Sequence, residues 1–314
     1  MRVAIVGAGI MGHALALVFA LGGHKVRITD RDPAALERAP KLMRAALETL
    51  VEAGEAASWT PERLDEAVRT HATLAETVGD AALVIEAIVE KPEAKRALFA
   101  ELDSLIPEHA ILASNTSYLD VFPLVPERRR ARSLIAHWYT PPYLIDLVDI
   151  VAGPRTDPAV VETVRDLVAR MGQKPIVLKR FVPGYIANRI QSAITLEVLR
   201  LLDEGVATPR EIDDSIIHGL GLRLALLGHL AKADFTGLEL TRQALANRSY
   251  DPPVPTGRSE TLDGLVAAGR TGVQAGRGYF DWGGRSPEDL FRERDRKLLA
   301  LKRALREIGP IQGT

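Results

Sequence analysis

The stretch Arg2–Asp30, RVAIVGAGIMGHALALVFALGGHKVRITD, decides the fold of this chain. It begins with a short β-branched strand, Val3–Val6, and then breaks into the glycine-rich turn GAGIMG at Gly7–Gly12. An apolar helix follows, and a second strand, Lys25–Thr29, leads into the acid at position 30. Strand, glycine-rich turn, helix, strand and terminal acid in this order predict an α/β domain that binds a dinucleotide.

The glycines and the acid of this stretch have separate physical tasks. Gly7 is expected to make the tight turn, Gly9 to let the backbone approach a pyrophosphate, and Gly12 to let the helix pack closely. The phosphates would lie at the helix N-terminus, where unpaired N–H groups favour negative charge. Asp30 is placed to accept hydrogen bonds from ribose hydroxyls and would repel a 2′-phosphate, so NAD is predicted rather than NADP. The adjacent Arg31 argues mildly the other way, and a purely structural glycine turn is the alternative.

A second pattern combines a histidine with an acid. Two apolar strands, Leu134–His137 and Leu147–Val151, are joined by WYTPPYLID, which predicts an antiparallel hairpin with His137 beside Asp149. A carboxylate next to one imidazole nitrogen fixes the tautomer and leaves the other nitrogen free to take a proton from a substrate hydroxyl. The pair therefore predicts a general base, and a salt-bridged core histidine is the structural alternative.

Composition excludes several classes of protein. Lys plus Arg is 40 and Asp plus Glu is 41, which argues against a nucleic-acid partner. With no cysteine there are no disulfides, thiolate metal sites or cysteine nucleophile, and no metal is expected. We see no signal peptide and no apolar stretch long enough to span a bilayer, so a soluble, cytoplasmic protein without a membrane partner is expected.

The 314 residues are expected to form two domains. Residues 1–182 alternate strands and helices, with helical material from Asp30 to about Thr70 that is predicted to project from the sheet. Residues 183–314 show only helical periodicity, and Thr208 begins a capping box. The prediction is an α/β domain followed by an all-α C-terminal domain.

Six segments together resemble the 3-hydroxyacyl-CoA dehydrogenase family over nearly the whole chain: GAGIMG, EAIVEKPEAK, ASNTS, AHWYTPPYLIDLVDIV, GQKPIVLKRFVPGYIANRIQ and GLGLRLALLG. Three stretches, the NPPY-like turn, GQKPIVLK and NRIQSAI, are most similar to a branch that contains λ-crystallin and L-gulonate 3-dehydrogenase. The resemblance implies a Rossmann-like N-terminal domain and a helical domain that contributes to the substrate cleft and to a homodimer.

The resemblance implies NAD-dependent oxidation of an L-3-hydroxyacyl-CoA to the 3-oxoacyl-CoA, a reaction of fatty acid metabolism. Oxidation of a small polar 3-hydroxy acid such as L-gulonate is one alternative, and a non-catalytic NADH-binding or structural role is another. A cationic patch for the CoA phosphates would favour the thioester. Lys41, Arg44 and Arg63 are candidates for that patch, although they are equally explained as solvated helix charges.

The family's functional residues are carried over motif by motif. The catalytic set comprises His137, Asp149, Ser117 and Asn188, and Thr140 would join Ser117 and Asn188 in holding the substrate. The cofactor contacts comprise Gly7, Gly9, Ile10, Met11, Gly12, Asp30, Glu90, Lys95 and Asn115. Structural alternatives are a turn cap for Ser117, a tie between domains for Asn188, and an exposed ion pair of little energetic value for Glu90 with Lys95.

Two positions depart from the family pattern. Thr140 stands where the family usually carries asparagine, so one hydroxyl replaces an amide. Asp149 replaces a glutamate and is shorter by one methylene, so contact with His137 is expected to need a small backbone shift or a bridging water. Both departures put the rate and the substrate in question more than the reaction class.

Overall fold

The computed structural model describes residues 1–247, 250–309 and 311. The chain divides into two compact units, Met1–Ala187 and Asn188–Thr314, and each is described by itself. This division lies a few residues beyond the expected boundary at residue 182, at the first residues of helix α7 (Ala187–Asp203).

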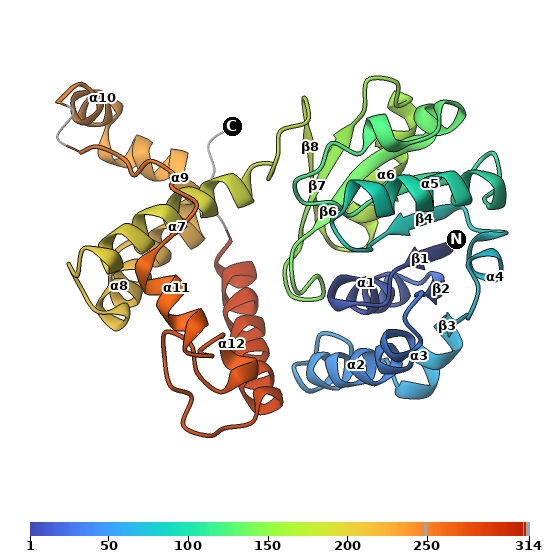
Figure 1. Ribbon diagram of the computed structural model, residues 1–314, viewed down its shortest axis with the longest axis horizontal. Coiled ribbons are helices and arrows are strands. Elements are labelled where there is room, and N and C mark those ends of the chain that lie inside the picture. Colours follow the sequence, from blue (N-terminus) through green and yellow to red (C-terminus); the bar gives the residue numbers. More distant parts are fainter. Residues whose placement is uncertain (248–249, 310, 312–314) are drawn as a thin grey trace. The chain divides into compact units, whose positions relative to one another are not determined.

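The first unit is built on one eight-stranded sheet with the order β3-β2-β1-β4-β5-β6-β7-β8 (Figure 1). The strands are β1 (Arg2–Val6), β2 (Lys25–Thr29), β3 (Val68–Thr70), β4 (Leu83–Glu86), β5 (Ile111–Ser114), β6 (Ser133–Trp138), β7 (Leu147–Ala152) and β8 (Lys174–Leu178). Neighbouring strands are parallel except β6 and β7, which form the predicted antiparallel hairpin. Because β1 lies between β2 and β4, the strand order reverses there and creates a crevice at the carboxyl ends of the strands. The predicted Rossmann-like domain is confirmed.

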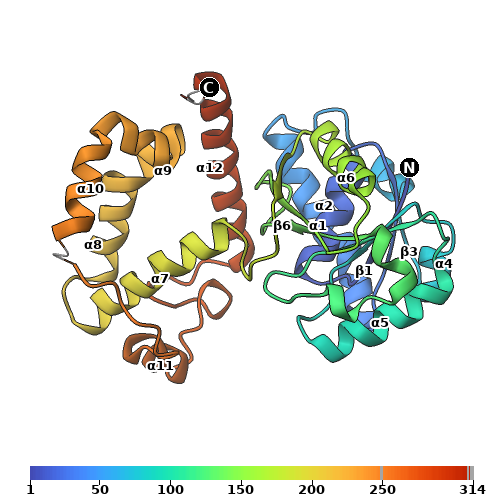
Figure 2. The same cartoon turned by 90° about the horizontal axis from the view of Figure 1, so that it is seen from above.

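Helices cover both faces of this sheet. They are α1 (Ile10–Leu21), α2 (Pro33–Glu52), α3 (Pro61–Ala67), α4 (Leu74–Val78), α5 (Pro92–Leu105) and α6 (Pro158–Arg170), with short 3₁₀ turns at Phe122–Leu124 and Glu127–Arg132. Figure 2 shows α1 and α6 on one side of the sheet and α5 on the other. Val84 and Ile135 of the sheet belong to the same buried cluster as Phe99 and Leu102 of α5. Such two-sided burial explains why these strands read as continuous apolar runs.

The end of the helical segment before Thr70 was predicted wrongly. Helix α3 begins as expected, because Thr60 Oγ1 accepts a hydrogen bond from Arg63 N–H at 3.3 Å. It ends at Ala67, and the last three residues of the expected helix form the edge strand β3, parallel to β2. β-branched Val68 and Thr70 fit a pleated edge better than a helix, and pairing with β2 satisfies their backbone groups.

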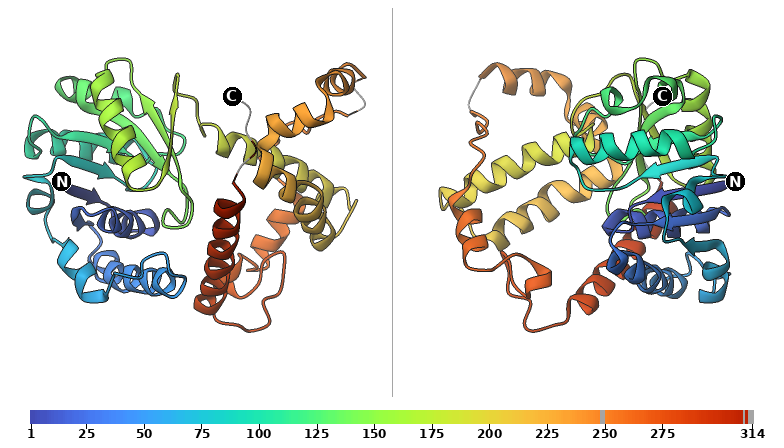
Figure 3. Two further views of the ribbon diagram at one scale, coloured as in Figure 1. Left: turned by 180° about the vertical axis from the view of Figure 1, so that it is seen from behind. Right: turned by 45° about the vertical axis from the view of Figure 1, so that its right-hand side comes forward.

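In the second unit, the described residues form helices and no extended strand, which confirms the all-α prediction (Figure 3). Besides α7 they are α8 (Pro209–Asp214), a π-helical segment (Ser215–Gly221), α9 (Leu222–Thr236), α10 (Leu238–Asn247), α11 (Glu260–Ala267), a 3₁₀ turn (Val273–Ala275) and α12 (Pro287–Ile308). The predicted capping box is present, since Thr208 and Glu211 each accept from the other's backbone N–H. No helix in the described part of the chain has the length and apolar character needed to cross a bilayer.

Candidate active site

The glycine turn joins β1 to α1 and has the geometry predicted for it. Gly7 has a φ of +106°, and its N–H donates to the carbonyl of Thr29 at 2.8 Å. A Cβ on Gly12 would lie 1.7 Å from the carbonyl oxygen of Gly7, so the close approach of helix and strand requires glycine there. Around Gly9, by contrast, no atom lies within 4 Å of such a Cβ. The turn is therefore tight on its inner side and open at Gly9.

Asp30 is part of the same turn. Its Oδ2 accepts from Ala8 N–H at 2.6 Å and its Oδ1 from Asp32 N–H at 2.8 Å. A groove of about 660 Å³ runs over this region at the point where the strand order reverses. Its lining includes Gly9, Ile10, Met11, Asp30, Ile88 and Leu98. An open glycine, a helix N-terminus and a fixed carboxylate in one groove fit the pyrophosphate and ribose of NAD.

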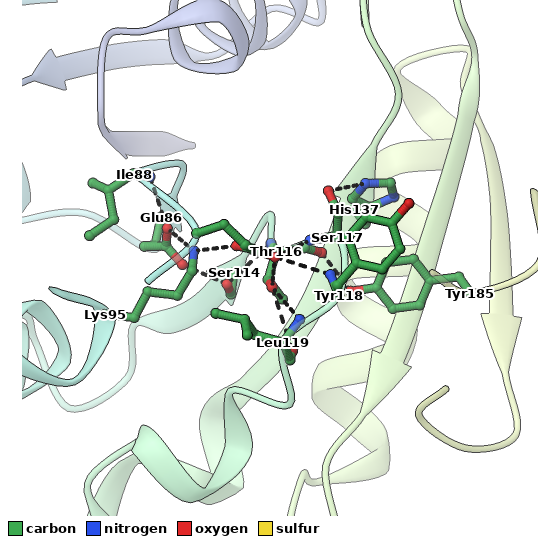
Figure 4. A network of polar contacts seen from close by, with 11 residues as sticks. Glu86, Ile88, Lys95, Ser114, Thr116, Ser117, Tyr118, Leu119, His137 and Tyr185 are labelled. Atoms are coloured by element: carbon green, nitrogen blue, oxygen red, sulfur yellow. Dashed lines mark hydrogen bonds and ion pairs between the residues drawn. The ribbon is translucent and has the colours of Figure 1, made fainter. Parts of the chain in front are cut away.

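Beside this groove lies a buried ion pair that the sequence analysis did not anticipate (Figure 4). Glu86 ends β4 and Lys95 lies in α5, with side chains 0% and 1% exposed, and Lys95 Nζ is 2.6 Å from Glu86 Oε1. The same carboxylate accepts from Ile88 N–H at 2.8 Å and from Ser114 Oγ at 2.6 Å. Lys95 Nζ also lies 3.2 Å from Glu90 Oε2. The exposed-pair alternative for Glu90 and Lys95 is therefore wrong, because the ammonium is enclosed between two carboxylates.

Glu90 connects this pair to the turn after β5. Its Oε1 accepts from Thr116 Oγ1 at 2.6 Å, from Ser117 N–H at 2.8 Å and from Tyr118 N–H at 3.0 Å. Partial burial raises the pKa of the Glu90 carboxyl, but these three bonds and the Lys95 charge outweigh it, so the pKa is lowered. An anionic Glu90 thus fixes the backbone that carries Ser117. The sequence signal for Glu86 was an acid at the end of an apolar strand, followed by a lysine in the next helix.

His137 lies opposite Asp149 in the β6–β7 register, as predicted. Its Nε2 is 3.1 Å from Ser117 Oγ, so the two are within hydrogen-bond distance. Its Nδ1 is 3.9 Å from Asp149 Oδ2, too far for a hydrogen bond, and it has no other partner among the described residues. Burial lowers the pKa of His137 to about 4, although the nearby Glu90 charge acts in the opposite direction. The imidazole is therefore neutral near pH 7 and can accept a proton.

Tyr139 is a site residue that the sequence analysis missed. Its hydroxyl donates to Asp149 Oδ2 at 2.6 Å, and its ring lies edge-on to the His137 ring with centroids 4.6 Å apart. Burial raises the pKa of the Asp149 carboxyl, and the bond from Tyr139 opposes that rise. The available signal was the two-residue period of strands, which places position 139 on the side of position 137.

Three further predicted residues have these positions. Asn115 Oδ1 accepts from Trp138 N–H at 2.9 Å, which ties the end of β5 to the end of β6. Thr140 Oγ1 lies 3.0 Å from Met11 Sδ, so this residue, which is predicted to contact the substrate, lies beside the glycine turn. Asn188 belongs to the helical unit, where its carbonyl accepts from a serine of α7, and its part in the site stays a prediction.

Two family models match this chain. The family model described as 3-hydroxyacyl-CoA dehydrogenase, NAD binding domain, matches residues 2–181, and the model of the C-terminal domain matches residues 184–282. The chain belongs to the 3-hydroxyacyl-CoA dehydrogenase family. It is an NAD-dependent dehydrogenase that acts on CH–OH groups, so the predicted cofactor and reaction class are confirmed.

Similar proteins within and near this family carry different names. L-carnitine dehydrogenase of Streptomyces griseus is 37% identical over 310 residues, which are 96% of this chain and 89% of that protein. Rabbit (Oryctolagus cuniculus) λ-crystallin is 33% identical over 230 residues, 73% of this chain and 72% of its own, which supports the expected similarity to that branch. The crystal structure of 5-formyl-3-hydroxy-2-methylpyridine 4-carboxylic acid 5-dehydrogenase, described as an NAD⁺-dependent dismutase, has a TM-score of 0.85 at 31% identity and 99% coverage of both chains.

Proposed function

We propose that this family member oxidises the 3-hydroxyl group of a small polar L-3-hydroxy acid, with His137 as the general base. The proposal rests on the 3.1 Å contact between Ser117 Oγ and His137 Nε2, in a turn held by Glu90 and within the NAD-binding unit. A substrate hydroxyl within hydrogen-bond distance of both atoms would have a hydrogen-bond partner in Ser117 and a base in His137.

The residues divide the proton chemistry among them. The groove with Gly9 and Asp30 would hold NAD, which would supply the acceptor for the hydride of the substrate C3 carbon. His137 Nε2 takes the hydroxyl proton as the C3–H bond breaks, and the C–OH group becomes C=O. Ser117 Oγ holds the reacting oxygen near Nε2, with Thr140 as a further substrate contact, and a substrate contact of Asn188 stays a prediction. Asp149, 3.9 Å from Nδ1, stabilises the imidazolium by charge rather than by a direct hydrogen bond.

The surroundings of the CoA candidates favour a free acid over a thioester. Lys41 lies 3.8 Å from Glu37, Arg44 lies 2.5 Å from Asp65, and the Arg63 guanidinium lies 4.4 Å from the centre of the Trp59 ring. Each candidate cation has a partner of the kind expected for solvated helix charges, which is the structural alternative to a phosphate-binding patch. Similar proteins named for L-carnitine and for a pyridine carboxylic acid, rather than for a thioester, agree with this choice.

An L-3-hydroxyacyl-CoA is the second candidate substrate. The family's own description and the 20-residue helix α2 next to the NAD-binding turn favour it, and a role in fatty acid metabolism would follow. A cytoplasmic location stays a prediction for either substrate.

Three assays of the purified protein separate these candidates. NAD reduction is measured with L-gulonate and with L-carnitine, and NADH oxidation is measured with acetoacetyl-CoA. Turnover of a free acid alone supports the proposal, whereas turnover of the thioester alone establishes the second candidate. No turnover with tight NADH binding would favour the non-catalytic alternative. His137→Gln is expected to abolish turnover and keep NADH affinity, and unchanged turnover in this variant would refute the mechanism.

We also propose that the protein is a homodimer through its helical unit. Helices α7, α9, α10 and α11 contain no buried residue in the described structure. Leu222, Leu230 and Phe235 are 77%, 80% and 70% exposed, and so much exposed apolar surface is unusual for a stable monomer. A second copy of the chain would cover it. Sedimentation should show a dimer that Phe235→Glu converts to monomer, while Leu42→Glu, at an exposed apolar position of α2, leaves it intact.

A further inference from the structure

Tyr139 donates a hydrogen bond to the acid that faces the catalytic histidine. We infer that Tyr139 is a positioning residue, whose hydroxyl holds the Asp149 carboxylate in its ionised form and in a fixed place beside His137. The inference deepens the proposed function and rests on the role of His137 as the base.

Asp149 needs a hydrogen-bond donor because it is buried and does not reach the imidazole. Asp149 lies in the middle of β7 with 1% of its surface exposed, so water does not stabilise its charge. Its Oδ2 is 3.9 Å from His137 Nδ1, and its Oδ1 has no hydrogen-bond partner in the described part of the chain. In the described part of the chain, the carboxylate is therefore held by the 2.6 Å hydrogen bond that the Tyr139 hydroxyl donates to Oδ2. A buried carboxylate needs such a donor, because an unpaired charge there is costly.

The ring of Tyr139 also acts on the imidazole directly. His137 lies between two tyrosine rings, with centroid distances of 4.6 Å to Tyr139 and 4.9 Å to Tyr185. The hydroxyl of Tyr185 points elsewhere and donates to the carbonyl of Thr116 at 2.5 Å. Both rings fix the plane of the imidazole, but only the hydroxyl of Tyr139 reaches Asp149. Tyr185 is therefore a matched control for a ring contact without the bond to the acid.

The charges around the pair determine the effect of removing this hydroxyl. The groups that face His137 and Asp149 are the Glu90 carboxylate, the Ser117 hydroxyl and the two tyrosines. Neither of the other two hydroxyls can replace Tyr139 as the donor to Asp149 without moving, because Ser117 lies on the Nε2 side of the ring and Tyr185 donates to the carbonyl of Thr116. Loss of the hydroxyl should let the buried carboxyl take up a proton more readily. A neutral acid no longer stabilises the imidazolium that forms during turnover.

The test is Tyr139→Phe, which keeps the ring and removes the hydroxyl. Carboxyl ¹³C NMR of aspartate-labelled protein gives the pKa of Asp149, with the signal assigned by Asp149→Asn. We expect this pKa to rise by about 1 unit, the equivalent of one hydrogen bond to a charged group. At pH values between the Asp149 pKa of the parent protein and that of the variant, kcat for alcohol oxidation should be lower in the variant, because only the parent keeps the charge that stabilises the imidazolium. The Kd of NADH should be unchanged.

Tyr185→Phe removes the hydrogen bond to the Thr116 carbonyl and should leave the pKa of Asp149 unchanged. An unchanged or lowered Asp149 pKa in Tyr139→Phe would overturn the inference, as would an equal shift in both variants. NADH binding shows whether each variant is folded. The NMR titration needs no substrate, so its outcome is distinct from a failure of the proposed substrate class.

Discussion

Replacing Lys95 by methionine should destabilise the NAD-binding unit strongly. The substitution keeps most of the apolar stem but removes an ammonium that lies 2.6 Å from Glu86 and 3.2 Å from Glu90. Glu86 is 0% exposed, so its charge cannot be transferred to water without opening the fold. Breaking a buried pair by removing one partner costs about 3–5 kcal/mol, out of about 5–15 kcal/mol that stabilises an ordinary domain.

The lower end of that range is expected here. After Lys95→Met, the Glu86 carboxylate still accepts from Ile88 N–H and from Ser114 Oγ, so part of its charge remains stabilised. A loss of about 3 kcal/mol is therefore the expected result. The double variant Glu86→Gln/Lys95→Met removes the buried charge as well and should recover most of this loss.

The assay is urea unfolding of the full chain followed by tryptophan fluorescence. Trp282→Phe is introduced in every variant, so that the signal comes from Trp59 and Trp138 in the NAD-binding unit. The control is Arg44→Met, which breaks an ion pair with Asp65 whose side chains are 49% and 44% exposed. An exposed pair of this kind contributes under about 1 kcal/mol.

If Lys95→Met lowered the free energy of unfolding by less than about 1 kcal/mol and raised the Kd of NADH, the structural role of Lys95 would be refuted. It would show instead that Lys95 leaves the pair to contact the cofactor. No recovery in the double variant would likewise contradict the reasoning, because the buried charge of Glu86 would then not be the cause of the loss.

Two further predictions concern the glycine turn and the histidine. Gly12→Ala forces a Cβ to 1.7 Å from the Gly7 carbonyl and should cost about 3 kcal/mol or more in urea unfolding, whereas Gly9→Ala should keep the fold and weaken the Kd of NADH about tenfold. Equal stability losses in the two variants would contradict this. Burial lowers the pKa of His137 from 6.5 to about 4, so between these values only the unfolded chain binds the proton and stability falls as the pH falls. The free energy of unfolding, measured in urea at each pH, should fall between pH 7 and pH 4 by roughly 3 kcal/mol more than in His137→Gln. The same pH dependence in both proteins would refute this.

Most of the fold could be predicted because its signals are local. The glycine turn places three backbone requirements within Gly7–Gly12, and the apolar hairpin strands have a period that specifies the facing of His137 and Asp149. Strand β3 could not be predicted in this way. It has only three residues, Val68–Thr70, which is too few to show alternation, and it exists because β2 offers a free edge.

The candidate site was predictable in its members but less so in their contacts. Sequence motifs identified Ser117 and His137, and the structure brings their side chains to 3.1 Å. The partners of Glu86 and Tyr139 were missed, because both depend on distances across the sheet rather than on spacing along the chain. The Asp149 carboxylate lies 3.9 Å from the imidazole nitrogen and accepts from the tyrosine hydroxyl at 2.6 Å, and a distinction of that size leaves no periodic signal in the sequence.

Asp30 has a consequence for redesign of the coenzyme preference. The carboxylate that would select against a 2′-phosphate also accepts from Ala8 N–H at 2.6 Å and so anchors the backbone of the glycine turn. Asp30→Ala would remove the charge that repels the 2′-phosphate of NADP. It would also remove the acceptor for Ala8 N–H. Asp30→Asn retains an acceptor for Ala8 while removing the negative charge. Asp30→Asn rather than Asp30→Ala is therefore the first substitution for changing the coenzyme preference of this protein from NAD to NADP.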